Sequence, residues 1–210
     1  MEVLNTLVLA VLATGFLMVS RRSLDAVIRL YALQNVLLAL VSFGLAQGEL
    51  HFVVAGLALF VLKGVAIPWY LFWLLDRLEV SHEVEGYLSV SFSLLLAGLL
   101  IALAFRVGAV FVLPEAPLPQ GVPVALSLVL LGMLSMVSRK KAISQVLGFL
   151  ALENGVFLLA LSESHGLPLF VELGVALDAF AAVFLAGVLI FRIKGEMGHV
   201  DTARMRALRG

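Results

Sequence analysis

Glu153 and Asn154 lie near the middle of a long apolar run. The segment 138–162 opens with three cations at 139–141 and then stays apolar for most of 20 residues, with this pair at its centre. A run of this length and composition is typical of a membrane-spanning helix. Glu153 lies 12 residues beyond Lys141, about 18 Å along a helix, which is close to the middle of a hydrocarbon core about 30 Å thick.

Charged residues at that depth can carry protons. An acid at the centre of a spanning helix costs about 2.5–3.5 kcal/mol on insertion scales, and an amide could join helices at lower cost. A row of titratable groups at mid-membrane, close enough for water to bridge them, is what a proton relay needs. We therefore interpret four charged residues inside apolar runs as proton-transfer candidates: Lys63, Glu153, Glu172 and Asp178.

Counting along the runs places most of these candidates at one depth. Asp178 lies 14 residues before Arg192, about 21 Å along a helix, and Lys63 lies at a similar depth in its own run. We expect both to be level with Glu153. Glu172 lies about 9 Å nearer the opposite face, and for this residue a relay role and a packing role are equally supported.

Three amides share the runs with these charges, namely Gln34, Asn35 and Asn154. Buried amides commonly hydrogen-bond neighbouring helices together, at about 0.6–2 kcal/mol each. We favour that supporting role over a direct part in proton transfer, because none of the three can titrate.

Pro68 follows Lys63 by five residues, with Gly64 between them. Proline has no N–H to donate to the carbonyl of Gly64, so the sequence predicts a kinked or loosened helix beside the lysine. Backbone groups freed at membrane depth must face protein or water. This favours a hydrated pocket around Lys63.

The chain as a whole reads as an all-α membrane protein with about seven transmembrane helices. Of its 210 residues, 62% are hydrophobic and 13% are charged, more apolar side chain than a soluble domain of this size can bury. The predicted spans are the apolar runs 3–19, 24–46, 52–75, 87–105, 122–137, 142–161 and 167–193. Residues 106–121 carry three prolines and are predicted to form an extended surface loop.

Basic residues set the expected orientation. With seven spans, 11 of the 14 cations fall on the side that also holds the C-terminal tail, and only Arg106 falls on the other side. Because Lys and Arg are enriched in cytoplasmic loops, we expect an outside N-terminus and a cytoplasmic C-terminus in the cell inner membrane. The N-terminal run has no basic region before it and is interpreted as the first span.

The two halves of the chain resemble each other. Aligning 20–40 with 139–159 places Gln34 on Glu153 and Asn35 on Asn154, and a further alignment places Lys63 on Asp178. We therefore predict a first three-helix repeat at 1–76, a linker helix and outer loop at 77–120, a second repeat at 121–194 and a tail at 195–210. The linker helix restores the direction of the chain, so the repeats are parallel.

The absence of some residues and motifs excludes several functions. The chain has no Cys, which rules out disulfides, thiolate metal sites and cysteine nucleophiles. It has no HExxH, P-loop or GxGxxG motif. No nucleic-acid partner is indicated. Ion movement and a scaffolding role remain.

The quoted motifs resemble a known family. RKKAISQVLGFLALENGVF, LFVELGVALDAFAAVF and the closing DTARMRALRG are similar to the E component of hydrogenase-4, a membrane subunit of the formate-hydrogenlyase type of nickel–iron hydrogenase. The first half agrees in SRRSLDAVIRLYALQN and FVLKGVAIP. The last three runs also resemble subunit K of respiratory complex I and the C subunit of Mrp-type antiporters. By that resemblance Asp178 matches the second acid of subunit K, whereas Glu153 is displaced by about one turn from the first.

The resemblance implies a non-catalytic subunit of a redox-driven complex. Its partners would be antiporter-like and other membrane-arm subunits in the lipid bilayer, together with a peripheral hydrogenase arm. That arm would carry a [NiFe] centre and iron–sulfur clusters, and no cofactor is expected on this chain, which has no Cys to ligate a cluster. Two alternatives stay open: a purely structural membrane subunit, and a subunit of an Mrp-type cation/proton antiporter.

Overall fold

The computed structural model describes residues 2–46, 48–78, 84, 86–112 and 118–163, and this part of the chain is almost entirely helical. Six stretches within it are long and apolar enough to cross a membrane, which confirms the all-α membrane fold. The seventh predicted span, 167–193, lies outside the described residues. The helices are α1 Glu2–Ser20, α2 Leu24–Leu45, α3 Leu50–Ala58, the π-helix η1 Leu59–Ala66, α4 Ile67–Leu78, α5 Val90–Phe111, α6 Gly121–Ser138 and α7 Ala142–Glu163.

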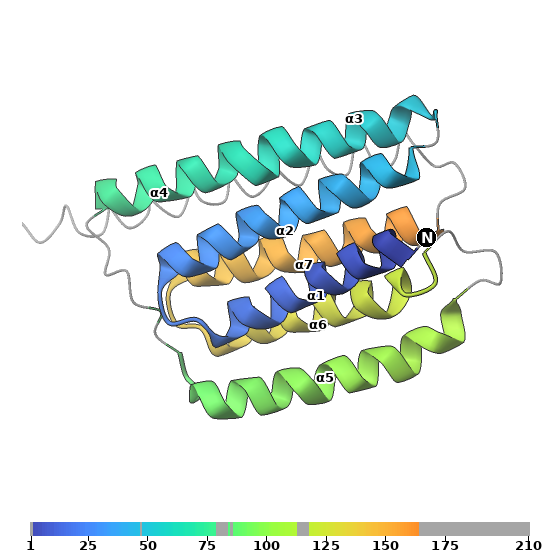
Figure 1. Ribbon diagram of the computed structural model, residues 1–210. Helices are drawn as coiled ribbons and strands as arrows, with labels where there is room; N and C mark the ends of the chain where they lie inside the picture. Colours follow the sequence, from blue (N-terminus) through green and yellow to red (C-terminus); the bar gives the residue numbers. More distant parts are fainter. Residues whose placement is uncertain (1, 47, 79–83, 85, 113–117, 164–210) are drawn as a thin grey trace, which may run out of the picture.

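The helices lie side by side as a bundle (Figure 1). α1, α2, α6 and α7 form its centre, the continuous rod α3–η1–α4 packs on α2, and α5 packs on α6 and α1 at the other side. The turns 21–23 and 139–141 lie together at one end of the bundle (left in Figure 1), and we call this the basic end because five of their six residues are Arg or Lys, apart from Ser23.

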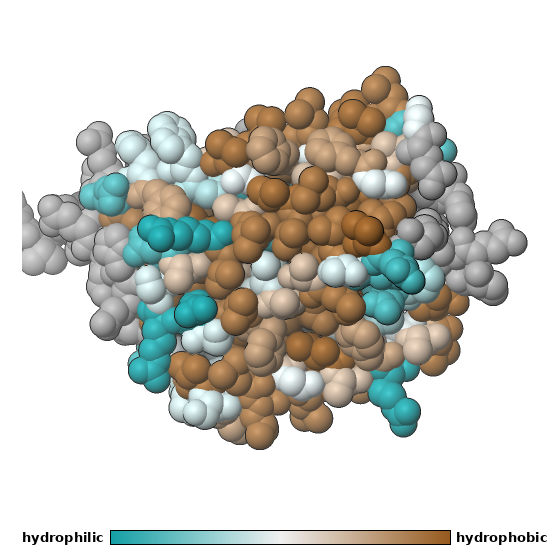
Figure 2. All heavy atoms as spheres, in the orientation of Figure 1, coloured by the Kyte–Doolittle hydropathy of each residue, from teal (hydrophilic) through white to brown (hydrophobic). Residues whose placement is uncertain are grey.

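The outer surface is apolar around the middle of the bundle. Figure 2 shows a wide hydrophobic band on the face drawn, with hydrophilic residues gathered toward its two ends. The polar residues near mid-bundle, by contrast, are buried: Gln34, Asn35, Lys63, Glu153 and Asn154. This distribution suits a lipid environment, in which polar groups must face protein.

Glycines bring α6 and α7 into backbone contact. A Cβ added at Gly132 would lie 2.7 Å from the carbonyl oxygen of Gly148, and one added at Gly155 would lie 2.8 Å from the carbonyl oxygen of Ala125. Gly148 and Gly155 are seven residues apart on α7, so they lie on the same side of the helix. Such small residues are the usual contact between packed membrane helices. The contact fixes the rotation of α7 and therefore the direction in which Glu153 points.

The fourth span differs from its predicted limits. It was expected at 87–105, but α5 begins at Val90, where the Ser89 hydroxyl caps the helix by accepting from the Phe92 N–H, and it continues to Phe111. Arg106 is therefore in the helix and not in the loop that was predicted to start there. Its side chain is exposed, and a long arginine within about two turns of a helix end can reach the membrane surface.

The internal repeat stays a prediction. The first and second helices of each proposed half, α1–α2 and α6–α7, both make a hairpin that turns at the basic end. The third helix of the second half and the tail at 195–210 lie outside the described residues, so the two halves cannot be superposed in full.

Candidate functional site

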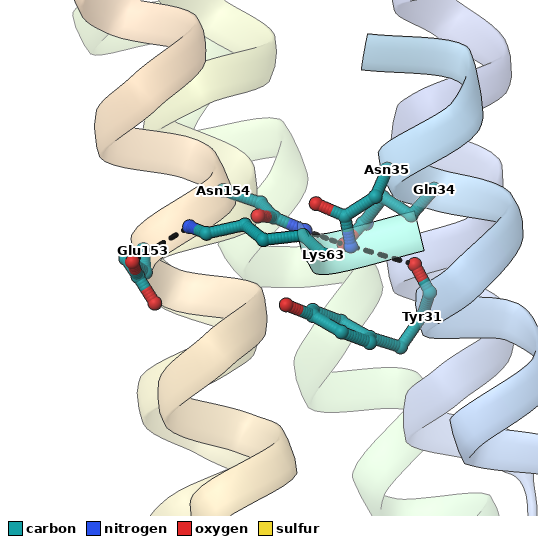
Figure 3. Close-up of polar contacts among 6 residues, drawn as sticks. All are labelled: Tyr31, Gln34, Asn35, Lys63, Glu153 and Asn154. Atoms are coloured by element: carbon teal, nitrogen blue, oxygen red, sulfur yellow. Dashed lines mark hydrogen bonds and ion pairs between the residues drawn. The ribbon is translucent and has the colours of Figure 1, made fainter. Parts of the chain in front are cut away.

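A lysine and a glutamate form an ion pair inside the bundle (Figure 3). The ammonium nitrogen of Lys63, on η1, lies 2.6 Å from Oε1 of Glu153, on α7. Only 1% of the lysine side chain and 4% of the glutamate side chain are exposed. The sequence predicted both residues at one depth, and the structure brings them into direct contact.

The π-helix positions the lysine. In η1 the Ile67 N–H donates to the Leu62 carbonyl, five residues earlier, which is the wider π pattern and not the α pattern. Pro68 directly follows and has no N–H to donate. The predicted loosening of the helix beside Lys63 is confirmed. The lysine itself, however, is buried against Glu153 and does not line an open pocket.

The two charges depend on each other. Transferring an ion out of water costs several kcal/mol, and only a close partner of opposite charge offsets this cost. If Glu153 took up a proton, the Lys63 ammonium would remain buried without its counter-ion. The low-energy states of the pair are therefore both groups charged or both neutral.

The amides form a separate chain of hydrogen bonds beside the ion pair. The Asn154 amide donates to Oε1 of Gln34 at 2.9 Å, and the Gln34 amide donates to the Val11 carbonyl at 3.3 Å. These bonds link α7 to α2 and α2 to α1. The Asn35 amide donates to the Tyr31 carbonyl one turn earlier, at 2.8 Å. Gln34 and Asn154 thus join helices, whereas the printed bond of the Asn35 amide lies within α2.

Tyr31 is a member of the site that the sequence analysis missed. Its side chain is fully buried, its phenol is directed toward α7, and the hydroxyl is within electrostatic range of the Glu153 carboxylate (Figure 3). The signal was present: Tyr31 precedes Gln34 by three residues and Asn35 by four, so all three lie on one face of α2.

The basic end holds a second cation, half-buried and with a different kind of partner. The half-buried Arg139 guanidinium donates to the carbonyl oxygens of Met18, Val19 and Arg21, at 3.3, 2.8 and 3.1 Å. The Met18 and Val19 carbonyls are in the last turn of α1, where the helix supplies no backbone N–H to them, and the Arg21 carbonyl follows in the turn. Burial lowers the pKa of the Arg139 guanidinium. The arginine ties the end of α1 to the turn between α6 and α7.

Five of the seven site candidates lie near mid-bundle in the described residues: Lys63 pairs with Glu153, Asn154 bonds Gln34, and Asn35 bonds the Tyr31 carbonyl. Asp178 and Glu172 lie outside the described residues, and their predicted roles stay predictions. No group of three or more His, Cys, Asp or Glu that suits a metal ion occurs among residues 2–163 as far as they are described.

The fold and the ion pair define a class of protein, a multi-pass α-helical membrane protein that holds a lysine–glutamate pair between its spans. Comparison with curated proteins gives its family. The chain is 33% identical over 197 residues to the uncharacterized protein Rv0085 of Mycobacterium tuberculosis. The aligned region covers 92% of this chain and 90% of that protein. The chain belongs to the same family as Rv0085.

A second group of relatives carries a functional name. The chain is 27% identical over 213 residues to Hydrogenase-4 component E of Escherichia coli K12. The aligned region covers 99% of this chain and 98% of that protein, and the chain is equally similar to the Shigella flexneri component. The resemblance to this component is thus supported over the whole chain, whereas the likeness to subunit K and to the Mrp C subunit stays a prediction. No family model and no solved structure matches the chain.

Proposed function

We propose that this chain is a membrane subunit of a multi-subunit hydrogenase complex and forms part of its path for protons or other cations. The near full-length similarity to Hydrogenase-4 component E supports the assignment to such a complex. The buried Lys63–Glu153 pair is the observation that carries the proposed path.

In this proposal Glu153 is the group that accepts and releases protons. A proton that arrives on the carboxylate removes its charge, and the Lys63 ammonium then loses the partner that offsets its burial. The lysine therefore passes its proton onward, and Asp178 is the proposed acceptor at the same depth. Glu172 lies closer to the opposite face in sequence and would follow Asp178 toward the exit.

The proposed complex supplies what this chain lacks. Antiporter-like and other membrane-arm subunits would flank it, and a peripheral hydrogenase arm would hold the [NiFe] centre and iron–sulfur clusters. Cluster ligands are typically cysteine thiolates, and this chain contains none. The positive-inside rule places the basic end and the C-terminal tail in the cytoplasm and the N-terminus outside.

Proton uptake by the intact complex in sealed vesicles tests the path. Glu153→Gln and Asp178→Asn keep the size and hydrogen bonding of each side chain but remove the titratable group. We expect both variants to assemble and to lose uptake. The matched control is Glu49→Gln, which removes an exposed acid at the opposite end of the bundle and should behave as wild type.

One further variant separates folding from transport. Glu153→Gln leaves the Lys63 ammonium without a charged partner, so Lys63→Met with Glu153→Gln provides a neutral pair that need not lose stability. Normal uptake by an assembled complex with this pair and Asp178→Asn would refute the proposed path. The chain would then be a structural membrane subunit.

A further inference from the structure

Several buried polar atoms around the ion pair have no hydrogen-bond partner within the described structure. They are the Tyr31 hydroxyl, Asn35 Oδ1 and Asn154 Oδ1 beside the pair, and the Ser144 hydroxyl nearer the basic end. Leaving such a group unsatisfied costs about 1–3 kcal/mol. Buried polar groups of this kind normally bind ordered water, so these positions are candidate water sites inside the bundle. Asn5 Oδ1 and Gln120 Oε1, toward the opposite end, are two further unpartnered atoms.

Two neighbouring cavities lie between the Ser144 position and the basic end. The larger, of about 470 Å³, is lined by polar side chains that include Arg22, Ser93 and Arg139. The smaller, of about 10 Å³, is lined by Ser144 and Gly148, and that volume is close to the room one water molecule needs. Arg139 and Val84 line both cavities, so they form the partition between them.

Tyr31 packs in the same buried cluster as two walls of the smaller cavity. Val27 and Leu147 form walls of that cavity, and both belong to the same packed cluster as the Tyr31 ring. Ser144 lies nine residues before Glu153 on α7, about 13.5 Å along the helix. The Tyr31 phenol points toward α7, on the side of Glu153 (Figure 3).

We infer that water and protons reach Glu153 from the basic end through these two cavities, and that the Tyr31 hydroxyl is the last protein group on this access route. The inference rests on the proposed function, since it supplies the approach to the same carboxylate. It assigns Ser144 to the lining of the route and Tyr31 to the proton-transfer step.

The step at Tyr31 is a relay through a neutral phenol. A protonated water on the side of Ser144 donates a proton to the phenol oxygen, while the O–H bond of Tyr31 breaks and its proton passes to the Glu153 carboxylate, directly or through one more water. The phenol is neutral before and after the transfer. The proton ends on Glu153, and a neutral water is left on the side of Ser144.

Removing the Tyr31 hydroxyl alone tests the route. In the intact complex, we expect Tyr31→Phe to slow proton uptake about tenfold or more, because a group that transfers protons is lost. The complex should still assemble, since the Tyr31 ring keeps its packing in the buried cluster. Tyr70→Phe, on α4, is the matched control and should have wild-type uptake.

A second pair of variants tests the cavity. Ser144→Ala removes a hydroxyl without a partner, whereas Ser127→Ala removes one that donates to the Pro123 carbonyl on α6, away from the route. We expect only Ser144→Ala to slow uptake. If access limits the rate, each unit of acidification at the basic end should speed the slowed variants by up to about tenfold, a response that a purely structural role would not produce.

The outcomes separate the two proposals. Wild-type uptake in both Tyr31→Phe and Ser144→Ala, with uptake lost in Glu153→Gln, would overturn the access route and leave the proposed function intact. Wild-type uptake in the assembled complex with the neutral Lys63→Met, Glu153→Gln pair and Asp178→Asn would remove the basis for both. Slow, acid-responsive uptake in either route variant, together with normal uptake in its control, supports the route.

Discussion

The middle of the bundle and its basic end each hold a cation, but the two cations have different kinds of partner. At mid-bundle the Lys63 ammonium lies 2.6 Å from a carboxylate oxygen. At the basic end the Arg139 guanidinium donates to three backbone carbonyls. The first partner can change its charge, and the second cannot.

This difference separates a site that can respond to a proton from one that only holds the fold together. Arginine stays protonated in proteins, and its planar group suits several fixed acceptors at once. Lysine gives up its proton more readily when it is buried, and glutamate can accept one. The pairing of two titratable groups at mid-bundle is therefore the feature on which the proposed path rests.

The largest effect is expected when one member of the mid-bundle pair is removed. Lys63→Met leaves the Glu153 carboxylate buried without its counter-ion, and we expect the free energy of unfolding to fall by about 3–5 kcal/mol. Denaturant unfolding in detergent micelles at neutral pH measures this loss.

The double variant is the control for that prediction. Lys63→Met combined with Glu153→Gln removes both charges, and buried ion pairs replaced by uncharged groups are often equally stable. We expect most of the lost stability to return. A double variant as unstable as Lys63→Met alone would show that the two residues do not act as a pair.

Arg139 should have the next largest effect. Arg139→Met removes hydrogen bonds from a charged donor to three carbonyls, and we expect a loss of about 1.5–3 kcal/mol in unfolding free energy. Arg139→Lys keeps the charge but cannot reach all three acceptors, so it should recover only part of this loss. The loss should not vary between about pH 6 and 8, because the guanidinium stays protonated. A strong pH dependence would contradict the structural role.

The sequence predicted the spans and the depth of the polar layer for simple physical reasons. Apolar runs of this length are typical of helices that cross a bilayer. The helical rise of 1.5 Å per residue converts a residue's distance in sequence from the basic turns into its depth in the membrane. The same counting predicted that Lys63 and Glu153 would be level. The loosened helix could be predicted from Pro68, because the missing N–H is a local property of the chain.

The partners within that layer could not be predicted in the same way. Helices such as α6 and α7 are apolar on most sides, so periodicity does not reveal which face meets which neighbour. The contact of Gly132 with Gly148 fixes that rotation, and it depends on two helices together. For the same reason Tyr31 was not predicted as part of the site, because the sequence of one span does not show which residue of another span faces it.

The amide chain at mid-bundle should matter less than either cation. Gln34→Met keeps the side-chain length but removes the bonds to Asn154 and Val11. We expect a loss of about 0.6–2 kcal/mol in unfolding free energy, the range for hydrogen bonds between membrane helices. A double-mutant cycle with Asn154→Leu measures the part that belongs to the Gln34–Asn154 bond. A coupling energy near zero would show that this bond does not join α2 to α7.

The smallest effect is expected at Lys140, the immediate neighbour of Arg139. Its ammonium lies 5.4 Å from the centre of the Tyr87 ring, and Tyr87 is 71% exposed. A cation over an exposed ring contributes about 0.5–1 kcal/mol, and salt weakens it further. We therefore expect Lys140→Gln to lower unfolding stability by no more than this amount, and by less at high ionic strength, when measured beside Arg139→Gln. The two residues are adjacent and carry the same charge, so the difference between the two stability losses reports the contribution of the carbonyl acceptors of Arg139. Equal losses in the two variants would mean that charge at the basic end, and not the three carbonyl bonds of Arg139, stabilises this end of the bundle.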